Sequence, residues 1–453
     1  MASISCAAAP KPSRIKTRKA NFLIRVQQTY VSKRFLSRFS PSYFRIITYF
    51  GRYMTKFSFV SAVLLCSLFL FQFQLQAQDT IRNRKDGNYF FTIKKDIEAN
   101  EVQNQNRTGT CWSFSALSFV ESELMRMGKG THKLSEMYIV RKAYEDKAEN
   151  YVRMHGMANF SQGGAFHDIP YVIKKYGIMP QEAYKGLNYG LETHNHSEME
   201  SVLKGMLDAV IANKQKELTT SWKKAFNAVL DAYLGAVPET FMYNDKSYTA
   251  KSFATNLGLN MDDYVIISSF THKPFYQPFV MDVPDNWIWA SAYNVPVDVM
   301  LNTMKSAVAN GYSIGWAADV SEKGFSFKNG LAIVPEDEDA LTVKGKDNQH
   351  FNDAGADKEG TQFDSPGPEL KITQEMRQAA YDNYLTTDDH GMHFTGLVTD
   401  QEGNEYFIVK NSWGTDHNDC DGYFYASMPY VAYKTINFMV HKDALPKDLK
   451  KKM

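Results

Sequence analysis

Apolar residues recur at helical spacing in the stretch that follows residue 111. The apolar positions are Leu117, Val120, Leu124 and Met127. Steps of three or four residues place them on one face of a helix, and Gly128 stands where such a helix would end. The pattern therefore predicts an amphipathic helix that begins at Cys111.

Further helices are expected in the first half of the chain. Residues 134–140 carry a second helical pattern, and residues 198–235 alternate charged and apolar residues in a helical manner, with Gly205 as an interruption. The segment 324–367 differs from both, because it is rich in Asp, Gly, Asn and Lys. Its composition predicts a long surface insertion.

The hydrophobic period changes in the last third of the chain. Residues 394–399 and 406–410 are β-prone and flank a turn-forming stretch, 400–404, which together predict a β-hairpin. Helices early in the chain and strands late in it indicate an α+β protein with a helical lobe and a sheet lobe.

The first 78 residues differ in charge from the rest. Residues 1–53 hold eleven Lys or Arg and no acidic residue, and Met54 then begins a short basic start, an apolar run and a glutamine-rich stretch before Asp79. This pattern predicts that residues 1–53 are not part of the mature protein and that residues 54–78 are a signal peptide. A membrane anchor is the alternative for 54–78, and a basic targeting extension is the alternative for 1–53.

Cleavage of that signal peptide would export the mature chain, residues 79–453, to the periplasm or the cell exterior. All 50 acidic residues lie at or after Asp79, so the mature chain is net acidic. Neither nucleic acid nor a membrane is an expected partner. Of the four cysteines, Cys111 and Cys420 belong to this part, and two cysteines make no disulfide framework.

The thiol of Cys111 is the strongest candidate for chemistry. At the start of a helix, unpaired N–H groups and the positive end of the helix dipole favour a thiolate, so the sequence predicts a lowered thiol pKa. A disulfide between Cys111 and Cys420 would remove this nucleophile. The chain is therefore interpreted as a cysteine hydrolase.

A nucleophilic cysteine needs a base, and the base needs an amide that orients it. The predicted hairpin brings His390 and Asn411 to one edge of the sheet, where they could meet Cys111 between the two lobes. His393 competes for the role of base. Positions 390 and 393 point to opposite faces of a strand, and a symmetric turn would place His393 nearer to Asn411.

Three segments resemble the papain superfamily and, within it, the bleomycin hydrolase and aminopeptidase C branch. They are Gln105 with residues 109–114, residues 390–392, and residues 410–414. The resemblance spans most of residues 100–445 and implies a papain-like two-lobe fold. It also implies large insertions around residues 190–370, because secreted papain-like enzymes place the histidine only about 130 to 150 residues after the cysteine.

The resemblance implies a cysteine peptidase that hydrolyses peptide substrates. Cys111 would attack the scissile carbonyl, and the resemblance selects His390 as its base. Asn411 would hold the imidazole ring. The side chain of Gln105 and the backbone N–H of Cys111 would bind the oxyanion.

Three further residues take substrate-binding roles by the same resemblance. Trp413 would shield the hydrogen bond between His390 and Asn411 from water. Gly163 and Gly164 would let an extended substrate backbone approach closely, because they carry no side chain.

The family resemblance also implies a homo-hexameric ring and aminopeptidase specificity, the latter through a C-terminal arm whose carboxylate receives the substrate amine. This chain ends in a shorter and more basic segment, 445–453, so an endopeptidase or broad-specificity peptidase is the alternative. No cofactor or metal is expected. His194, His196 and Glu198 lack the helical HExxH arrangement and are predicted to lie in a solvated loop.

Overall fold

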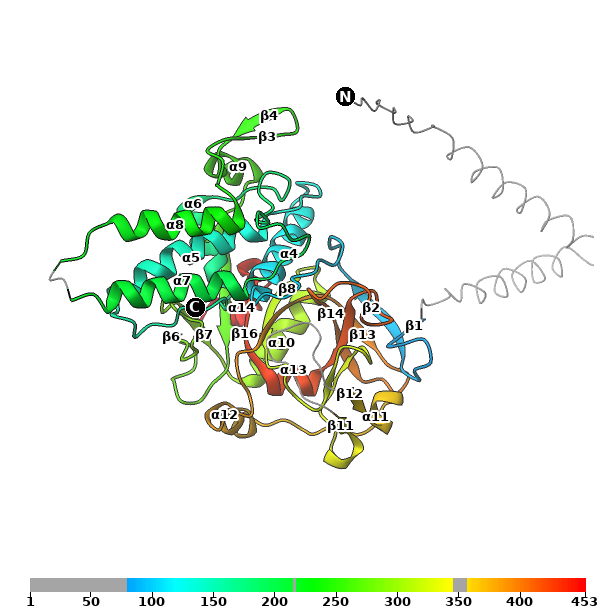
Figure 1. Cartoon of the computed structure of the whole chain (residues 1–453). Helices are drawn as coiled ribbons and strands as arrows, with labels where there is room; N and C mark the ends of the chain where they lie inside the picture. Colours follow the sequence, from blue (N-terminus) through cyan, green and yellow to red (C-terminus); the bar gives the residue numbers. More distant parts are fainter. Residues whose placement is uncertain (1–79, 215–216, 345–356) are drawn as a thin grey trace, which may run out of the picture. The chain divides into compact units, whose positions relative to one another are not determined.

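The computed structural model describes residues 80–214, 217–344 and 357–453 (Figure 1). The basic segment 1–53 and the predicted signal peptide 54–78 lie outside the described residues. In the part that is described, none of the helices is long and apolar enough to span a bilayer.

Helices build the first part of the described chain. The predicted helix at residue 111 is confirmed as α4, Cys111–Arg126. The predicted helix near residue 134 is confirmed as α5, Glu136–Arg153, which begins after Ser135, whose side chain accepts a hydrogen bond from the Tyr138 N–H. The next helices are α6 (Asp168–Tyr176), α7 (Ser197–Ile211), α8 (Ser221–Leu234) and α9 (Ala250–Leu257).

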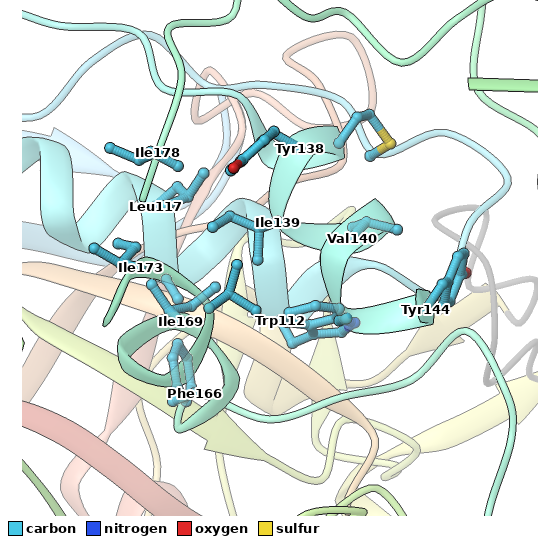
Figure 2. Packing of buried hydrophobic residues seen from close by; sticks show 14 of the residues in the cluster. Trp112, Leu117, Tyr138, Ile139, Val140, Tyr144, Phe166, Ile169, Ile173 and Ile178 are labelled. Atoms are coloured by element: carbon cyan, nitrogen blue, oxygen red, sulfur yellow. The ribbon is translucent and has the colours of Figure 1, made fainter. Parts of the chain in front are cut away.

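The apolar faces of α4, α5 and α6 meet in one buried cluster (Figure 2). Leu117 comes from α4, Ile139 and Val140 from α5, and Ile169 and Ile173 from α6, and all of them are buried. Each such side chain contributes about 1.5–3 kcal/mol by leaving water. The helix that carries Cys111 is therefore fixed on its inner face.

One mixed sheet dominates the rest of the described chain. Its strand order is β6, β7, β5, β16, β8, β13, β14, β15, β10, β9, and β2 pairs with the far half of β13 and with β1. The bounds are β1 Thr80–Arg82, β2 Phe90–Asp96, β5 Tyr264–Ser268, β6 Pro278–Val280, β7 Ser291–Asn294, β8 Ile314–Ala318, β9 Phe325–Ser326, β10 Leu331–Ala332, β13 His390–Thr399, β14 Glu405–Lys410, β15 Tyr423–Ser427 and β16 Thr435–His441. The chain thus has the α+β composition that the sequence predicts.

Short elements complete the described chain. Two separate hairpins are formed by β3 (Phe241–Tyr243) with β4 (Lys246–Tyr248) and by β11 (Thr342–Lys344) with β12 (Asp357–Glu359). The remaining α-helices are α10 (Val297–Ala309), α11 (Thr361–Asp364), α12 (Gln374–Asp382), α13 (Met428–Lys434) and α14 (Lys447–Lys450). Single 3₁₀ turns lie at Met261–Asp263, Glu338–Ala340 and Lys442–Ala444.

Two sequence expectations are wrong in detail. Gly205 does not interrupt a helix, because α7 runs through it and the break comes between residues 211 and 221; a helical glycine costs about 1 kcal/mol, which the buried Leu203 and Leu207 outweigh. The start of segment 324–367 is no surface excursion either. Phe325 and Leu331 are buried in β9 and β10 at the edge of the main sheet.

The predicted hairpin is confirmed as β13 and β14, but its register is not symmetric. Phe394 lies opposite Val409 and Gly396 lies opposite Ile408, so Thr395 is an extra residue on β13. This bulge places His393 opposite Lys410 and not opposite Asn411. A strand register predicted from the turn residues alone misses this bulge, because the turn residues give no sign of it.

Candidate active site

A cavity of about 530 Å³ lies where α4 meets the strands of the sheet. Its wall includes Cys111 at the start of α4, Gln105 before that helix, His390 at the start of β13, and Trp413. The loop 161–166, which carries the two predicted glycines, forms another part of the wall. Six of the seven residues predicted for the site therefore line one cavity, and the seventh, Asn411, lies directly behind His390.

Cys111 occupies the first position of α4, as the sequence predicts, but its pKa moves in the opposite direction. Burial raises the pKa of the thiol to about 12, and the charges of Asp388 and Asp285 act in the same direction. Hydrogen bonds from the backbone N–H groups of Gly391 and Trp112 oppose this shift without reversing it. The predicted lowering is wrong because the desolvation of the sulfur outweighs the helix terminus.

His390 is held by the amide of Asn411. The ring Nε2 lies 2.7 Å from Asn411 Oδ1, and the backbone N–H of Ser412 donates to the same oxygen. Because a side-chain carbonyl only accepts, Nε2 carries the proton, and Nδ1 is left with its lone pair. Burial lowers the pKa of His390 to about 4, against the bond to Asn411, which raises it.

Burial thus disfavours the charged form of each catalytic partner taken alone. Proton transfer from the Cys111 sulfur to His390 Nδ1 creates both charges at once, so each charge stabilises the other. An imidazolium at His390 would therefore stabilise a thiolate at Cys111.

His393 is excluded from the site by its position. It is fully buried and its Nδ1 lies 3.0 Å from the hydroxyl of Ser118 on the inner side of α4. It does not line the cavity. Of the two histidines that the sequence leaves open, His390 is the one beside Cys111.

Trp413 covers the pair formed by His390 and Asn411. Its ring centroid is 4.7 Å from that of His390, and only 4 % of Trp413 is exposed. Phe325 and Phe327 meet the indole edge to face. An apolar cover of this kind keeps water from competing for the hydrogen bond, which agrees with the shielding role predicted for Trp413.

Hydrogen bonds fix both the backbone and the side chain of Gln105. Its backbone N–H donates to the carbonyl of Ser412, the Ser412 hydroxyl donates to Oε1 at 2.6 Å, and Nε2 donates to the carbonyl of Thr108 at 2.7 Å. An amide nitrogen has two hydrogens, so one is left for the cavity. Gln105 is thus oriented as an oxyanion donor has to be.

Neither Gly163 nor Gly164 has room for a side chain. A Cβ on Gly164 would lie 2.7 Å from the ring of Trp112, and a Cβ on Gly163 would lie 1.9 Å from Asp285 Oδ2. The Gln162 side chain joins this loop to the nucleophile segment, since its Oε1 accepts from the Gly109 N–H at 2.8 Å. Contact of Gly163 and Gly164 with a substrate backbone remains a prediction.

The histidines before α7 do not form a solvated loop. His196 is 0 % exposed, and its ring packs on Tyr144 and His194. Burial lowers the pKa of His196 to about 3 and that of His194 to about 4. Periodicity could not show this, because the burial depends on α5 lying beneath α7.

Carboxylates are the part of the site that the sequence interpretation missed. Glu200, Asp285, Asp388 and Asp389 line the cavity. Asp388 and Asp389 directly precede His390, and this proximity in sequence is a signal that points to them. Glu200 and Asp285 carry no local signal, because the cavity is assembled from segments far apart in the chain.

A cysteine at a helix start, an imidazole held by an amide, and a glutamine amide line one cavity between a helical part and a sheet, and together they define a papain-like cysteine peptidase. Comparison with known families agrees. A model of the Peptidase C1-like family matches residues 72–336 and 369–453. The chain therefore belongs to the Peptidase C1-like family.

Curated relatives and one solved structure extend this result. Aminopeptidase C of Listeria innocua serovar 6a is 25 % identical over 397 residues, which is 78 % of this chain and 83 % of the relative. Bleomycin hydrolase of Rattus norvegicus is 22 % identical over 405 residues, which is 78 % of this chain and 82 % of the relative. The crystal structure of PepW from Lactobacillus rhamnosis HN001 shares the fold, with a TM-score of 0.59, 20 % identity, and coverage of 80 % of this chain and 84 % of that one.

Proposed function

We propose that this cysteine peptidase is an aminopeptidase that removes residues from peptides with a free amino terminus. The observation that carries the proposal is the 2.7 Å bond between His390 and Asn411 in the wall that also holds Cys111 and Gln105. The curated relatives named aminopeptidase C and bleomycin hydrolase support the exopeptidase class. Neither of these two relatives supports the endopeptidase alternative.

The chemistry follows from the positions of these four residues. His390 Nδ1 takes the proton of the Cys111 thiol, and the sulfur attacks the scissile carbonyl to form a tetrahedral intermediate. The free N–H of Gln105 and the backbone N–H of Cys111 stabilise its oxyanion. The imidazolium then protonates the leaving amine, and water hydrolyses the thioester with His390 as base.

The proposal is tested with Cys111→Ala. The variant should lose cleavage of an aminoacyl-coumarin substrate to below roughly one part in a thousand of the wild-type rate, because no other group of the cavity replaces the thiol. The rate is measured by fluorescence, and a peptidyl epoxide should label the wild type and not the variant. Cys420→Ala is the matched control and should keep full activity.

Specificity is tested with one peptide in free and N-acetylated form. A wild-type preference for the free amine supports an aminopeptidase, and equal cleavage of both forms contradicts it. Activity retained in Cys111→Ala would contradict the cysteine mechanism itself. Export of the chain and a homo-hexameric ring stay predictions, and gel filtration with light scattering checks the second.

A further inference from the structure

The charged groups on the cavity wall are mostly acidic. Glu200, Asp285, Asp388 and Asp389 line it, and no Lys or Arg does so among the described residues. A partly enclosed cavity with charges of one sign concentrates ligands of the opposite sign. A wall of this composition favours a ligand that carries a positive charge.

Asp285 lies directly against the loop that carries the two glycines. Its Oδ1 accepts a hydrogen bond from Asn159 Nδ2 at 2.9 Å and lies 3.4 Å from the hydroxyl of Ser161. The other oxygen, Oδ2, is the atom that a Cβ on Gly163 would meet at 1.9 Å. The carboxylate is thus held through one oxygen and presents the other at the Gly163 backbone.

The loop that carries Asp285 is anchored on both sides. Asn286 donates to the carbonyls of Met281 and Ala290 at 3.0 and 2.9 Å and accepts from the Ala290 N–H at 2.8 Å. Trp287 donates through Nε1 to Asp168 Oδ2 at 2.9 Å. A carboxylate fixed in this way needs little ordering when a ligand binds.

Asp388 places a second carboxyl group in the cavity wall, and burial raises the pKa of this group well above its usual range. Its Oδ2 is buried and has no hydrogen-bond partner among the described residues. A buried oxygen of this kind costs free energy until a donor reaches it. Asp388 and Asp285 both act on the charge of Cys111, so both are within electrostatic reach of the nucleophile.

The nearest buried cation leaves this charge only partly balanced. Lys147 donates through Nζ to the carbonyls of Ser161 and Gly163, and it does not line the cavity. Burial raises the pKa of Asp285, and the charge of Lys147 opposes this shift without cancelling it. Oδ2 of Asp285 lies against Gly163 in the wall of the cavity.

The C-terminal residues lie elsewhere in the structure. The carbonyl of Lys452 accepts from the hydroxyl of Tyr293 at 2.5 Å, the Lys452 ammonium lies 3.8 Å from the ring centroid of Tyr276, and Leu449 is buried. None of residues 445–453 lines the catalytic cavity. Among the described residues, the candidates to receive a substrate amine are therefore side chains of the wall.

We propose that Asp285 receives the protonated α-amine of the substrate and closes the path for peptides that extend further past Gly163. The inference rests on the proposed aminopeptidase function and assigns its specificity to one residue. An α-amine is favoured over a basic side chain, because the carboxylate stands against the backbone of the loop that is predicted to align the substrate backbone.

The test compares wild type with Asp285→Asn on four coumarin substrates: alanyl, lysyl, acetyl-alanyl and acetyl-lysyl. Asparagine keeps the size of the side chain and its contact with Asn159, and it removes the charge. KM for the alanyl and lysyl substrates should rise roughly 10- to 100-fold with a smaller change in kcat, because a hydrogen bond to a charged group is lost. The rates for the acetylated substrates should stay the same or rise.

Asp282→Asn is the matched control, since Asp282 is an exposed residue of the same segment and pairs with His272 and Lys273. It should leave all four rates unchanged, and epoxide labelling of Cys111 with equal melting temperatures shows that both variants are folded. If Asp285→Asn keeps the wild-type preference for a free amine, the inference is overturned. It is also overturned if the loss falls on acetyl-lysyl alone, because the carboxylate would then bind a side chain. A wild type that cleaves none of the four contradicts the proposed function instead.

Discussion

The hydroxyl of Ser412 decides which end of the Gln105 amide faces the cavity. Because this hydroxyl donates to Oε1, the NH₂ group must point the other way, and one of its hydrogens reaches the cavity. The orientation of an oxyanion donor is thus set by the residue that directly follows Asn411. Residues 411–412 therefore position both the imidazole of His390, through Asn411, and the oxyanion donor Gln105, through Ser412.

Gln105→Ala should reduce kcat by roughly 100- to 1000-fold with little change in KM, because the lost donor acts mainly on the oxyanion. Steady-state kinetics on an alanyl-coumarin substrate measure both constants. Gln103→Ala is the control, since Gln103 does not line the cavity, and it should retain the wild-type kcat. A change confined to KM would show that Gln105 binds the ground state instead.

At the scale of elements, the residue before α7 is His196, whose buried ring has no hydrogen-bond partner among the described residues. Neither ring nitrogen of His196 is hydrogen-bonded among the described residues, although the side chain is buried. The fold therefore keeps this ring neutral, with a pKa of about 3, whereas the unfolded chain binds a proton near pH 6.5. The stability that depends on the neutral ring is present above about pH 6.5 and is lost as pH falls towards the folded-state pKa.

His196→Phe should consequently flatten the fall of unfolding free energy between about pH 6.5 and pH 4. A phenyl ring keeps the packing on Tyr144 and leaves no polar atom unpaired, so stability at neutral pH should change by less than about 1.5 kcal/mol. Urea unfolding at several pH values measures both effects. The exposed His155 offers a control, since His155→Phe should keep the wild-type pH slope.

Sequence patterns predict the elements better than the contacts between them. The helix from Cys111 and the hairpin around residues 400–404 follow from periods and turn residues that are local. The bulge at Thr395 and the burial of Cys111 are not local, because both depend on strands and loops from other parts of the chain. This is why the helical pattern places Cys111 correctly at a helix start, whereas the pKa shift inferred from that position has the wrong sign.

At the scale of the whole molecule, Arg377 on α12 joins three distant segments. Its guanidinium donates to the carbonyls of Ser269, Ala432 and Thr435, and it is fully buried. Ser269 follows β5 within the predicted insertion, and the other two carbonyls lie at the end of α13 and the start of β16. The Arg377 side chain thus links the insertion to the C-terminal part of the sheet through hydrogen bonds.

Arg377→Met should destabilise the protein by roughly 3–5 kcal/mol, because the change leaves buried carbonyls without donors. Thermal and urea unfolding should show a lowered midpoint, and kcat should be maintained below that midpoint because Arg377 does not line the cavity. Arg153→Met makes the same substitution at the exposed end of α5 and should unfold as the wild type does. Equal stability of the two variants would remove Arg377 from this role.

The predicted insertion around residues 190–370 is where the sequence was least informative about the site. It supplies Glu200 on α7 and Asp285 in the loop between β6 and β7, and both reach a cavity whose nucleophile lies far earlier in the chain. Only the closure of the whole fold brings them there. The long spacing between Cys111 and His390, together with the family resemblance, indicated an insertion and could not indicate which of its carboxylates line the cavity.

The desolvated state of the Cys111 sulfur has a consequence for its survival. Peroxide attacks thiolates, so the raised pKa of the Cys111 thiol predicts slow oxidation of its sulfur to sulfenic acid. Mass spectrometry after peroxide treatment should therefore show less oxidation of Cys111 in the folded protein than in an unfolded peptide that contains the same cysteine and its neighbours. Slow oxidation at this position would keep the nucleophile available for the next substrate.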